Sequence, residues 1–225
     1  MTKEMNRREF LKTAAAAGVV LAANDVPSGS AHEFNPIQLL PPQLDGGRPL
    51  MQVLKDRSSW RAYTAKEIPL QVLSNLLWAA FGVNRPESGK RTAPSALNLQ
   101  NTDIYVATPE GVYVYDGKAH SLYQVVAEDV RPLSGRQQTS PLDDAPINLI
   151  YVADFSKFKK VGEQTFSVAF ANAAFIIQNV YLYCASEGLA TVVRLRFDKA
   201  ELDKAMKLRP DQYITLVQSV GYPRK

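Results

Sequence analysis

The sequence predicts an α+β domain in which a mixed, mainly antiparallel sheet is flanked by helices. Segments whose apolar residues recur at helical spacing occur beside short apolar runs bounded by turn residues, which are typical of strands. Two of those runs are separated by only a short turn and are expected to pair as a hairpin. The sequence has no internal repeat or low-complexity run, so one packed domain is expected.

Residues 1–31 have the organisation of an export signal. The charged segment Asn6-Arg7-Arg8-Glu9-Phe10-Leu11-Lys12 precedes an apolar run over 13–23, and a small-residue stretch ends at Ala31. The run is shorter than the roughly 20 residues that span a bilayer. The segment resembles a twin-arginine signal, although Asn6 stands where Ser or Thr is usual. We therefore expect a signal peptide at 1–31, export by the twin-arginine translocase and a periplasmic protein; an uncleaved anchor or a chance basic start is the alternative.

The chain after residue 31 has 194 residues, which is compatible with one domain. Removing the four basic and three acidic residues of the leader changes the net charge from +4 to +3. That mild excess forms no basic stripe with interleaved aromatic residues, so nucleic-acid binding is not expected. The single cysteine, Cys184, excludes an internal disulfide. His32 and His120 have no spacing typical of a metal site, and no metal is expected.

The first part of the predicted domain contains an arm and two helices. Residues 32–48 are rich in proline and glycine, so we expect an extended arm before a domain at 49–225. A short helix is predicted at 49–56. A longer helix is predicted at 68–81, because its leucines lie at helical spacing and Gly82 supplies a stop. The polar residues 84–92 are expected to form a loop.

The remaining chain is predicted to contain six strands and two helices. The predicted strands are 103–107, 111–115, 121–126, 147–153, 192–196 and 213–221. A long helix is predicted at 161–187, ended by Gly188. A shorter helix is predicted from Asp198, a capping residue, to about Lys207.

The long predicted helix is apolar almost all round. Between Phe166 and Leu182 the pattern is interrupted chiefly by Asn172, Gln178 and Asn179. A helix of this kind is usually buried on every side, and its amides make it a poor membrane span. Two explanations remain open, namely burial at the centre of a monomer or burial in a large apolar homodimer interface.

Two polar clusters form the candidate binding site. Arg57-Ser58-Ser59-Trp60-Arg61 places two guanidinium groups and two hydroxyls within five residues, which suits a phosphate and a polyol. In the loop 93–100, Pro94 stiffens the chain while Ser95 and Asn98 offer donors and acceptors for a polar heterocycle. Phosphate, polyol and heterocycle are the three parts of flavin mononucleotide, FMN. Each cluster also has an ordinary explanation, as surface arginines with serines and as a turn or helix cap.

Together the clusters resemble the nitroreductase family of flavoproteins. Residues 57–61 are similar to the family's Arg-x-Ser-x-Arg pattern, and residues 94–100 to its Pro-Ser-x-x-Asn-x-Gln loop. The resemblance implies a nitroreductase-like fold, an FMN cofactor and a homodimer with long interface helices. It implies that the FMN phosphate and ribityl chain are bound by Arg57, Ser58, Ser59 and Arg61. It also implies that the flavin is reached from the second subunit by Pro94, Ser95, Ala96 and Asn98.

Other stretches resemble the subgroup of this family that includes SagB-type dehydrogenases. They are Leu76–Arg85, Gly111–Asp116 with His120, Gln178-Asn179 and Gly221-Tyr222-Pro223. The resemblance covers roughly Pro49 to the end of the chain. Arg224 is similar to basic residues that touch the phosphate in relatives, although it could also belong to a solvated tail.

The sequence departs from the family after Gly188. Where many relatives carry Pro-Ile-Gly/Glu-Gly, whose backbone approaches flavin N5, this chain has Val193-Arg194-Leu195-Arg196. Arg194 and Arg196 are therefore candidate cofactor-binding residues, because positive charge near N1 and N5 would raise the flavin potential. The alternative is that an arginine here points to solvent from an edge strand.

The predicted function is an FMN-dependent oxidoreductase that works by ping-pong hydride or electron transfer through flavin N5 on a small-molecule substrate. No catalytic side chain is assigned. Nicotinamide cofactors are expected in the cytoplasm, so a quinol, a redox protein or a substrate that is itself oxidised is the expected donor. The alternative is a flavin-binding electron carrier, or a non-catalytic binding module that retains the fold.

Overall fold

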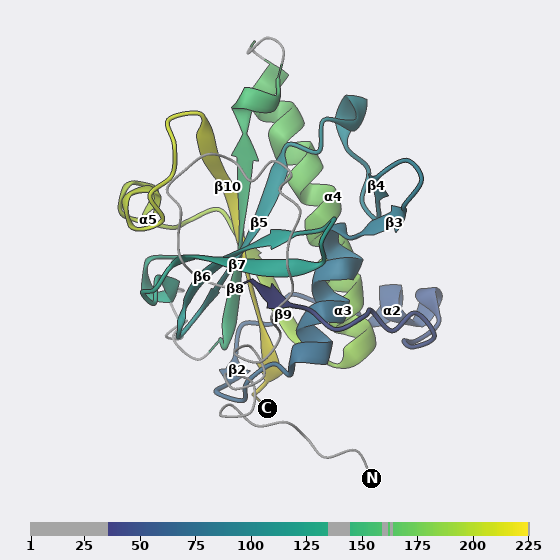
Figure 1. The fold of residues 1–225 in the computed structure, drawn as a ribbon. Coiled ribbons are helices and arrows are strands. Elements are labelled where there is room, and N and C mark those ends of the chain that lie inside the picture. Colours follow the sequence, from purple (N-terminus) through teal and green to yellow (C-terminus); the bar gives the residue numbers. More distant parts are fainter. Residues whose placement is uncertain (1–35, 135–144, 159–161, 163, 225) are drawn as a thin grey trace.

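The structure is a computed structural model that describes residues 36–134, 145–158, 162 and 164–224. The expected leader at 1–31 lies outside the described residues. An eight-stranded sheet forms the centre, in the order β1-β7-β6-β5-β8-β10-β2, with β9 paired to β10 (Figure 1). Every strand pairing in the described chain is antiparallel. The predicted α+β class is confirmed.

The long strands lie close to their predicted positions. The sheet consists of β1 (Ile37–Gln38), β2 (Tyr63–Thr64), β5 (Thr102–Thr108), β6 (Gly111–Asp116), β7 (Ser121–Val126), β8 (Ile147–Asp154), β9 (Ala190–Arg194) and β10 (Gln212–Pro223). The expected hairpin is confirmed, with Tyr115 opposite Leu122. Strand β8 is buried along its whole length because β5 and β10 flank its edges and an apolar core covers each of its faces.

The structure corrects two of the predicted elements. The segment 84–92 was expected to be a loop, but β3 (Val83–Arg85) and β4 (Lys90–Arg91) form a small second sheet there. The strand expected at 192–196 lies two residues earlier, at Ala190–Arg194, because its register pairs Gly221 with Ala190 and Val217 with Arg194. Leu195 and Arg196 therefore follow the strand instead of forming its end.

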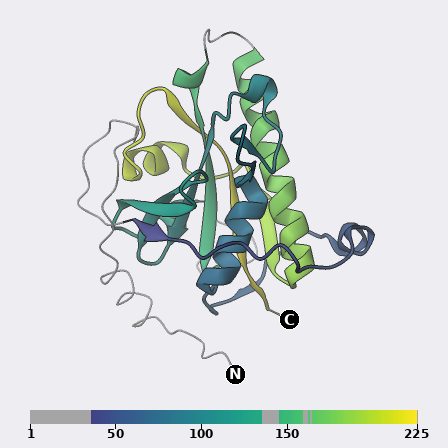
Figure 2. The ribbon, with the colours of Figure 1, turned by 45° about the vertical axis from the view of Figure 1, so that its right-hand side comes forward.

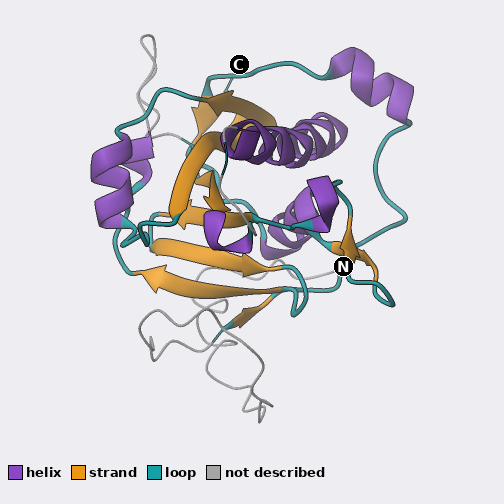
Figure 3. Ribbon diagram, turned by 90° about the horizontal axis from the view of Figure 1, so that it is seen from above, coloured by secondary structure: helices purple, strands orange, loops and turns teal. Residues whose placement is uncertain are grey.

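The helices divide between the two faces of the sheet. They are α2 (Leu50–Asp56), α3 (Leu70–Phe81), α4 (Gln164–Glu187) and α5 (Lys199–Ala205). Helices α3 and α4 lie side by side on one face, and α5 covers the other (Figures 1 and 2). Helix α2 stands at the side of the molecule, away from the sheet (Figure 3). Each face has its own apolar core, so the sheet is the middle layer of three.

Helix α4 is the principal packing element on its face. Ala173, Ile176 and Val180 are fully buried against α3 and the sheet. Phe175, in contrast, is 47% exposed, and Ala171, Ala174 and Gln178 on the same side are also exposed. By length and apolarity α4 could cross a membrane, but 44% of its apolar window is buried inside the protein. The structure thus buries one side of this helix and leaves an apolar side uncovered.

His120 joins the N-terminal arm to the domain. Its Nε2 atom lies 2.7 Å from the Ser74 hydroxyl and 3.1 Å from the Leu40 carbonyl oxygen, and its Nδ1 lies 2.9 Å from the Tyr115 hydroxyl. A neutral ring that donates from Nε2 and accepts at Nδ1 satisfies these contacts. Burial lowers the pKa of His120, although the Leu40 carbonyl opposes that shift. The folded state therefore favours the neutral imidazole.

We expect acidification to destabilise the protein through His120. Because the pKa is depressed on folding, the stabilisation is present above the unfolded pKa of about 6.5 and is lost as pH falls through the folded value. Urea denaturation at several pH values between about 8 and about 5 measures the free energy of unfolding. His120→Gln should flatten that pH dependence. A slope equal to that of the wild type in this variant would contradict the assignment.

A candidate cofactor site beside strand β9

The arginine loop, residues 57–61, begins where α2 ends. Arg57 closes the helix with a bond from its N–H to the Val53 carbonyl and then adopts an extended conformation. The Trp60 N–H donates to the Thr191 carbonyl at 2.9 Å. That bond fixes the loop to the outer edge of β9. The two arginines and two serines therefore lie along a strand edge, and not on one helical turn.

Tyr181 of α4 connects the arginine loop to β9. Its hydroxyl lies 3.0 Å from the Ser59 hydroxyl and accepts the Val193 N–H at 3.0 Å. The Arg57 guanidinium lies over its ring, with the Cζ atom 5.4 Å from the ring centroid. This cation–π contact orients the side chain of Arg57. Tyr181 thus fixes the relative positions of the Arg57 guanidinium, the Ser59 hydroxyl and the Val193 N–H.

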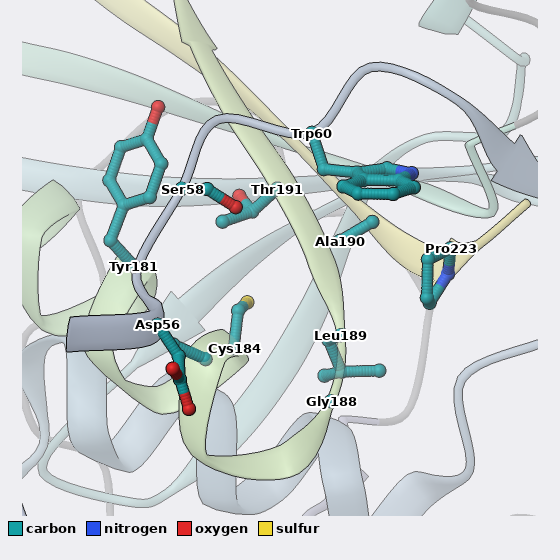
Figure 4. Close-up of a pocket in the computed structure, with 11 residues that line it drawn as sticks. Asp56, Ser58, Trp60, Tyr181, Cys184, Gly188, Leu189, Ala190, Thr191 and Pro223 are labelled. Carbon is teal, nitrogen blue, oxygen red and sulfur yellow. The ribbon is translucent and has the colours of Figure 1, made fainter. Parts of the chain in front are cut away.

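A cavity of about 210 Å³ adjoins this junction. Ser58 and Trp60 of the arginine loop line it, opposite Leu189 and Ala190 of the β9 region (Figure 4). The buried thiol of Cys184 lies at its floor, and burial raises the pKa of that thiol, which keeps it protonated. Arg61 is exposed, and its Nη1 lies 3.5 Å from the Ser59 carbonyl oxygen. Arg61 is thus free to contact a ligand outside the cavity.

The polar loop, residues 94–98, is conformationally strained. Leu97 has φ 52° and Asn98 has φ 54°, and Gln100, just after it, has φ 45°. Left-handed conformations are unfavourable for residues other than glycine, so the surroundings must hold them. The side chain of Leu97 is 93% exposed. The loop therefore presents an apolar side chain outward from a strained backbone.

Two side chains hold the polar loop in this conformation. Asn172 of α4 accepts the Ala96 N–H at 3.0 Å and donates to Asn101 at 2.7 Å. Arg91 donates from Nε to the Gln100 side chain at 2.8 Å and from Nη1 to the Phe81 carbonyl at 2.8 Å. The guanidinium of Arg91 also lies over the Phe81 ring. Both clusters therefore depend on side chains that lie elsewhere in the sequence.

The two clusters do not meet within one chain. The polar loop is anchored at Asn172 and the arginine loop at Tyr181, nine residues further along α4. Nine residues of α-helix correspond to about 13–14 Å. The polar side chains of the two clusters therefore cannot contact one small group from the same chain.

The basic residues near the end of β9 have different environments. Arg194 is only 7% exposed, and its Nε and Nη1 atoms have no hydrogen-bond partner. Arg196 is exposed and Leu195 is 67% exposed, and both residues follow the end of β9. Arg224 continues β10, and its N–H donates to the Ala62 carbonyl next to Arg61. The structure thus brings Arg224 to the arginine loop.

Comparison with known proteins identifies the family. A model of the nitroreductase family matches residues 54–222, and a model of the twin-arginine translocation pathway signal sequence matches residues 4–23. A predicted nitroreductase of Methanocaldococcus jannaschii is 34% identical over 182 residues, which is 76% of this chain and 90% of that protein. The chain belongs to the nitroreductase family.

Solved structures of nitroreductases show the same fold. A predicted nitroreductase from Ralstonia eutropha superposes with a TM-score of 0.81 and 36% identity, covering 90% of this chain and 97% of that one. An FMN-dependent nitroreductase from Clostridium difficile superposes with a TM-score of 0.56 and 19% identity, covering 78% and 88%. The nitroreductase-like fold expected from the sequence is confirmed, and the twin-arginine signal marks this nitroreductase for export.

Sequence reasoning missed the residues that hold the nitroreductase clusters in place. Tyr181, Asn172 and Arg91 make the decisive contacts. Asn172 was noted only as an interruption of the apolar helix, and that interruption is the one signal that could have identified it. Tyr181 and Arg91 carry no local signal, because their partners are brought together only by the tertiary fold.

We expect Tyr181→Phe to loosen the arginine loop. The substitution keeps the ring under Arg57 but removes the hydroxyl, leaving the Val193 N–H and the Ser59 hydroxyl without this partner. The expected loss is about 1–3 kcal/mol in the free energy of unfolding, measured by urea denaturation. Tyr183→Phe removes a hydroxyl that donates to the Val72 carbonyl at the longer distance of 3.3 Å; it is the matched control and should lose less. A larger loss in the control would contradict the role of Tyr181.

Proposed function

We propose that the protein is an FMN-dependent oxidoreductase that acts in the periplasm by a ping-pong cycle on a small-molecule substrate. When bound, FMN supplies two-electron chemistry through its N5 atom. The observation that carries the proposal is the fastening of the arginine loop to β9 by Tyr181. The protein's own residues bind and orient the cofactor; none is proposed as an acid or base.

The charges around the arginine loop suit a phosphate group. Arg57, Arg61 and the neighbouring Arg224 supply positive charge, and Ser58 and Ser59 supply hydroxyls. Guanidinium groups form strong, directional hydrogen bonds with phosphate oxygens. The unpartnered nitrogens of Arg194 add positive charge that no described side chain neutralises. These features support an anionic cofactor.

The cofactor site is proposed to be completed by a second copy of the chain. In one chain the polar loop and the arginine loop are anchored nine residues apart on α4, and the polar loop presents the exposed side chain of Leu97 from a strained backbone. The uncovered apolar side of α4, with Phe175 and Ala171, supplies an interface suited to a homodimer. In such a dimer Pro94, Ser95, Ala96 and Asn98 of one subunit would reach the cofactor of the other.

Export separates the enzyme from cytoplasmic nicotinamide cofactors. The twin-arginine signal supports a folded, cofactor-loaded protein that acts outside the cytoplasm. We therefore propose that the electron donor is a quinol, a redox protein or a substrate that is itself oxidised. Sustained turnover of the mature protein with NADH would contradict this choice of donor.

The visible absorption spectrum tests the proposed cofactor. The mature protein should purify with a flavin spectrum, and Arg57→Ala should lose it because the phosphate loses a charged partner. Asn98→Ala should also lose it if the polar loop contacts the flavin. Lys204→Ala, an exposed residue of α5, is the control and should retain the flavin. A colourless wild-type protein that cannot be reconstituted with FMN would overturn the proposal.

Mixing the two flavin-free variants tests the shared site. When Arg57→Ala and Asn98→Ala subunits exchange, each mixed dimer contains one site with both defects and one intact site. Random exchange should restore FMN to about a quarter of the sites, because about half of the dimers are mixed. No restoration after verified exchange would show that both residues act within one subunit.

A further inference from the structure

Arg194 lies among neutral polar side chains on the face of the sheet opposite α4. Its strand neighbour in register is Val217, which belongs to the core under α5. The Nη2 atom lies 3.4 Å from Oδ1 of Asn148, at the weak limit of a hydrogen bond. That oxygen also accepts from the Ser219 hydroxyl, and the Asn148 amide donates to Ser134 at 2.8 Å. The guanidinium therefore has only a neutral partner that is already shared.

A buried cation in this setting is costly to the folded protein. No carboxylate of the described residues pairs with Arg194, and its Nε and Nη1 atoms are buried without a partner. Removing a charge from water without pairing it is unfavourable, and an apolar side chain of similar size is often more stable. Burial accordingly lowers the pKa of Arg194. The charge of Arg194 is therefore better suited to the protein with an anionic cofactor bound than to the cofactor-free protein.

We propose that Arg194 holds a positive charge behind strand β9 that no carboxylate of the described residues neutralises, and that this charge favours the reduced, more negative state of a flavin bound beside the other face. The adjacent residue, Val193, donates its N–H to Tyr181, whose hydroxyl also contacts Ser59. The arginine loop thus contacts β9 directly at Thr191, three residues before Arg194, and through Tyr181 at Val193, the residue before Arg194. This inference rests on the proposed FMN function and assigns a residue that adjusts the reduction potential of the bound flavin.

The electrostatic argument follows from the charge change on reduction. At neutral pH, two-electron reduction adds two electrons and one proton to the flavin ring, so the ring gains one negative charge. A positive charge inside the protein is weakly screened and lowers the free energy of that state. Exposed charges are screened by water and salt. Arg194 would act on the bound flavin through the electric field of its charge, and it makes no proposed contact with the cofactor.

Arg194→Met is the decisive variant. In the FMN-loaded protein we expect the equilibrium constant for two-electron reduction to fall at least about tenfold, which lowers the midpoint potential by about 30 mV. A reductive titration against a reference dye measures that potential. In the flavin-free protein the same substitution should raise the melting temperature by at least about 2 °C, because it removes an unpaired buried charge.

Two further variants separate this role from a structural one. Arg194→Lys keeps the charge and should keep the midpoint potential close to that of the wild type. Lys204→Met removes an exposed charge on α5 and should change neither potential nor melting temperature. An unchanged potential in Arg194→Met would overturn the inference, as would a lower melting temperature of its flavin-free form. A wild-type protein unable to bind FMN would instead contradict the proposed function, and this inference with it.

Discussion

The packing of α4 across the sheet is the constraint on which both candidate clusters depend. Its buried side fixes the helix against α3, β5, β8, β9 and β10, and two polar residues on that helix then hold the surface loops. Tyr181 fastens the arginine loop to β9, and Asn172 fastens the polar loop. A shift of the helix along its axis would move both loops together, so the packed core sets the geometry of the surface site.

The strain in the polar loop indicates where the binding energy of a partner would act. Left-handed residues at Leu97 and Asn98 raise the free energy of the loop, and Asn172 and Arg91 offset it with hydrogen bonds. The strained backbone holds the polar groups of the loop and the apolar side chain of Leu97 in one outward-facing conformation. A partner then binds a preorganised surface and loses less entropy on association.

Much of the fold could be predicted because its signals are local. The leucines of α3 and the apolar pattern of α4 placed those helices, and short apolar runs bounded by turn residues placed β5 to β8. The register of β9 could not be read locally, because it is set by pairing with β10 between residues that lie 23 to 31 positions apart in the sequence. The small β3–β4 sheet was missed because polar residues dominate its strands, and its pairing is supported by a bond from the Arg85 side chain to the Arg91 carbonyl.

The candidate site was predictable as two motifs, whereas their relation was not. Residue types at 57–61 and 94–98 carry the chemistry, and that information is present in the sequence. The two motifs are anchored to residues of α4 that lie nine positions apart, and that separation is visible only in the folded structure. Arg194 is buried as the last residue of β9, whereas Arg196 follows the strand and is exposed, so the difference depends on where β9 ends and could not be read from the sequence.

The size of the cavity beside the arginine loop supports a site shared between subunits. Its volume of about 210 Å³ is below the roughly 300–1,000 Å³ that is typical of pockets for ligands. A three-part cofactor held by the arginine loop would therefore extend beyond this cavity, over open surface beside β9. Water there would screen the charges of Arg57 and Arg61. A second wall, supplied by the polar loop of another copy, would exclude that water and strengthen every charged contact, so dimerisation and cofactor affinity should be coupled.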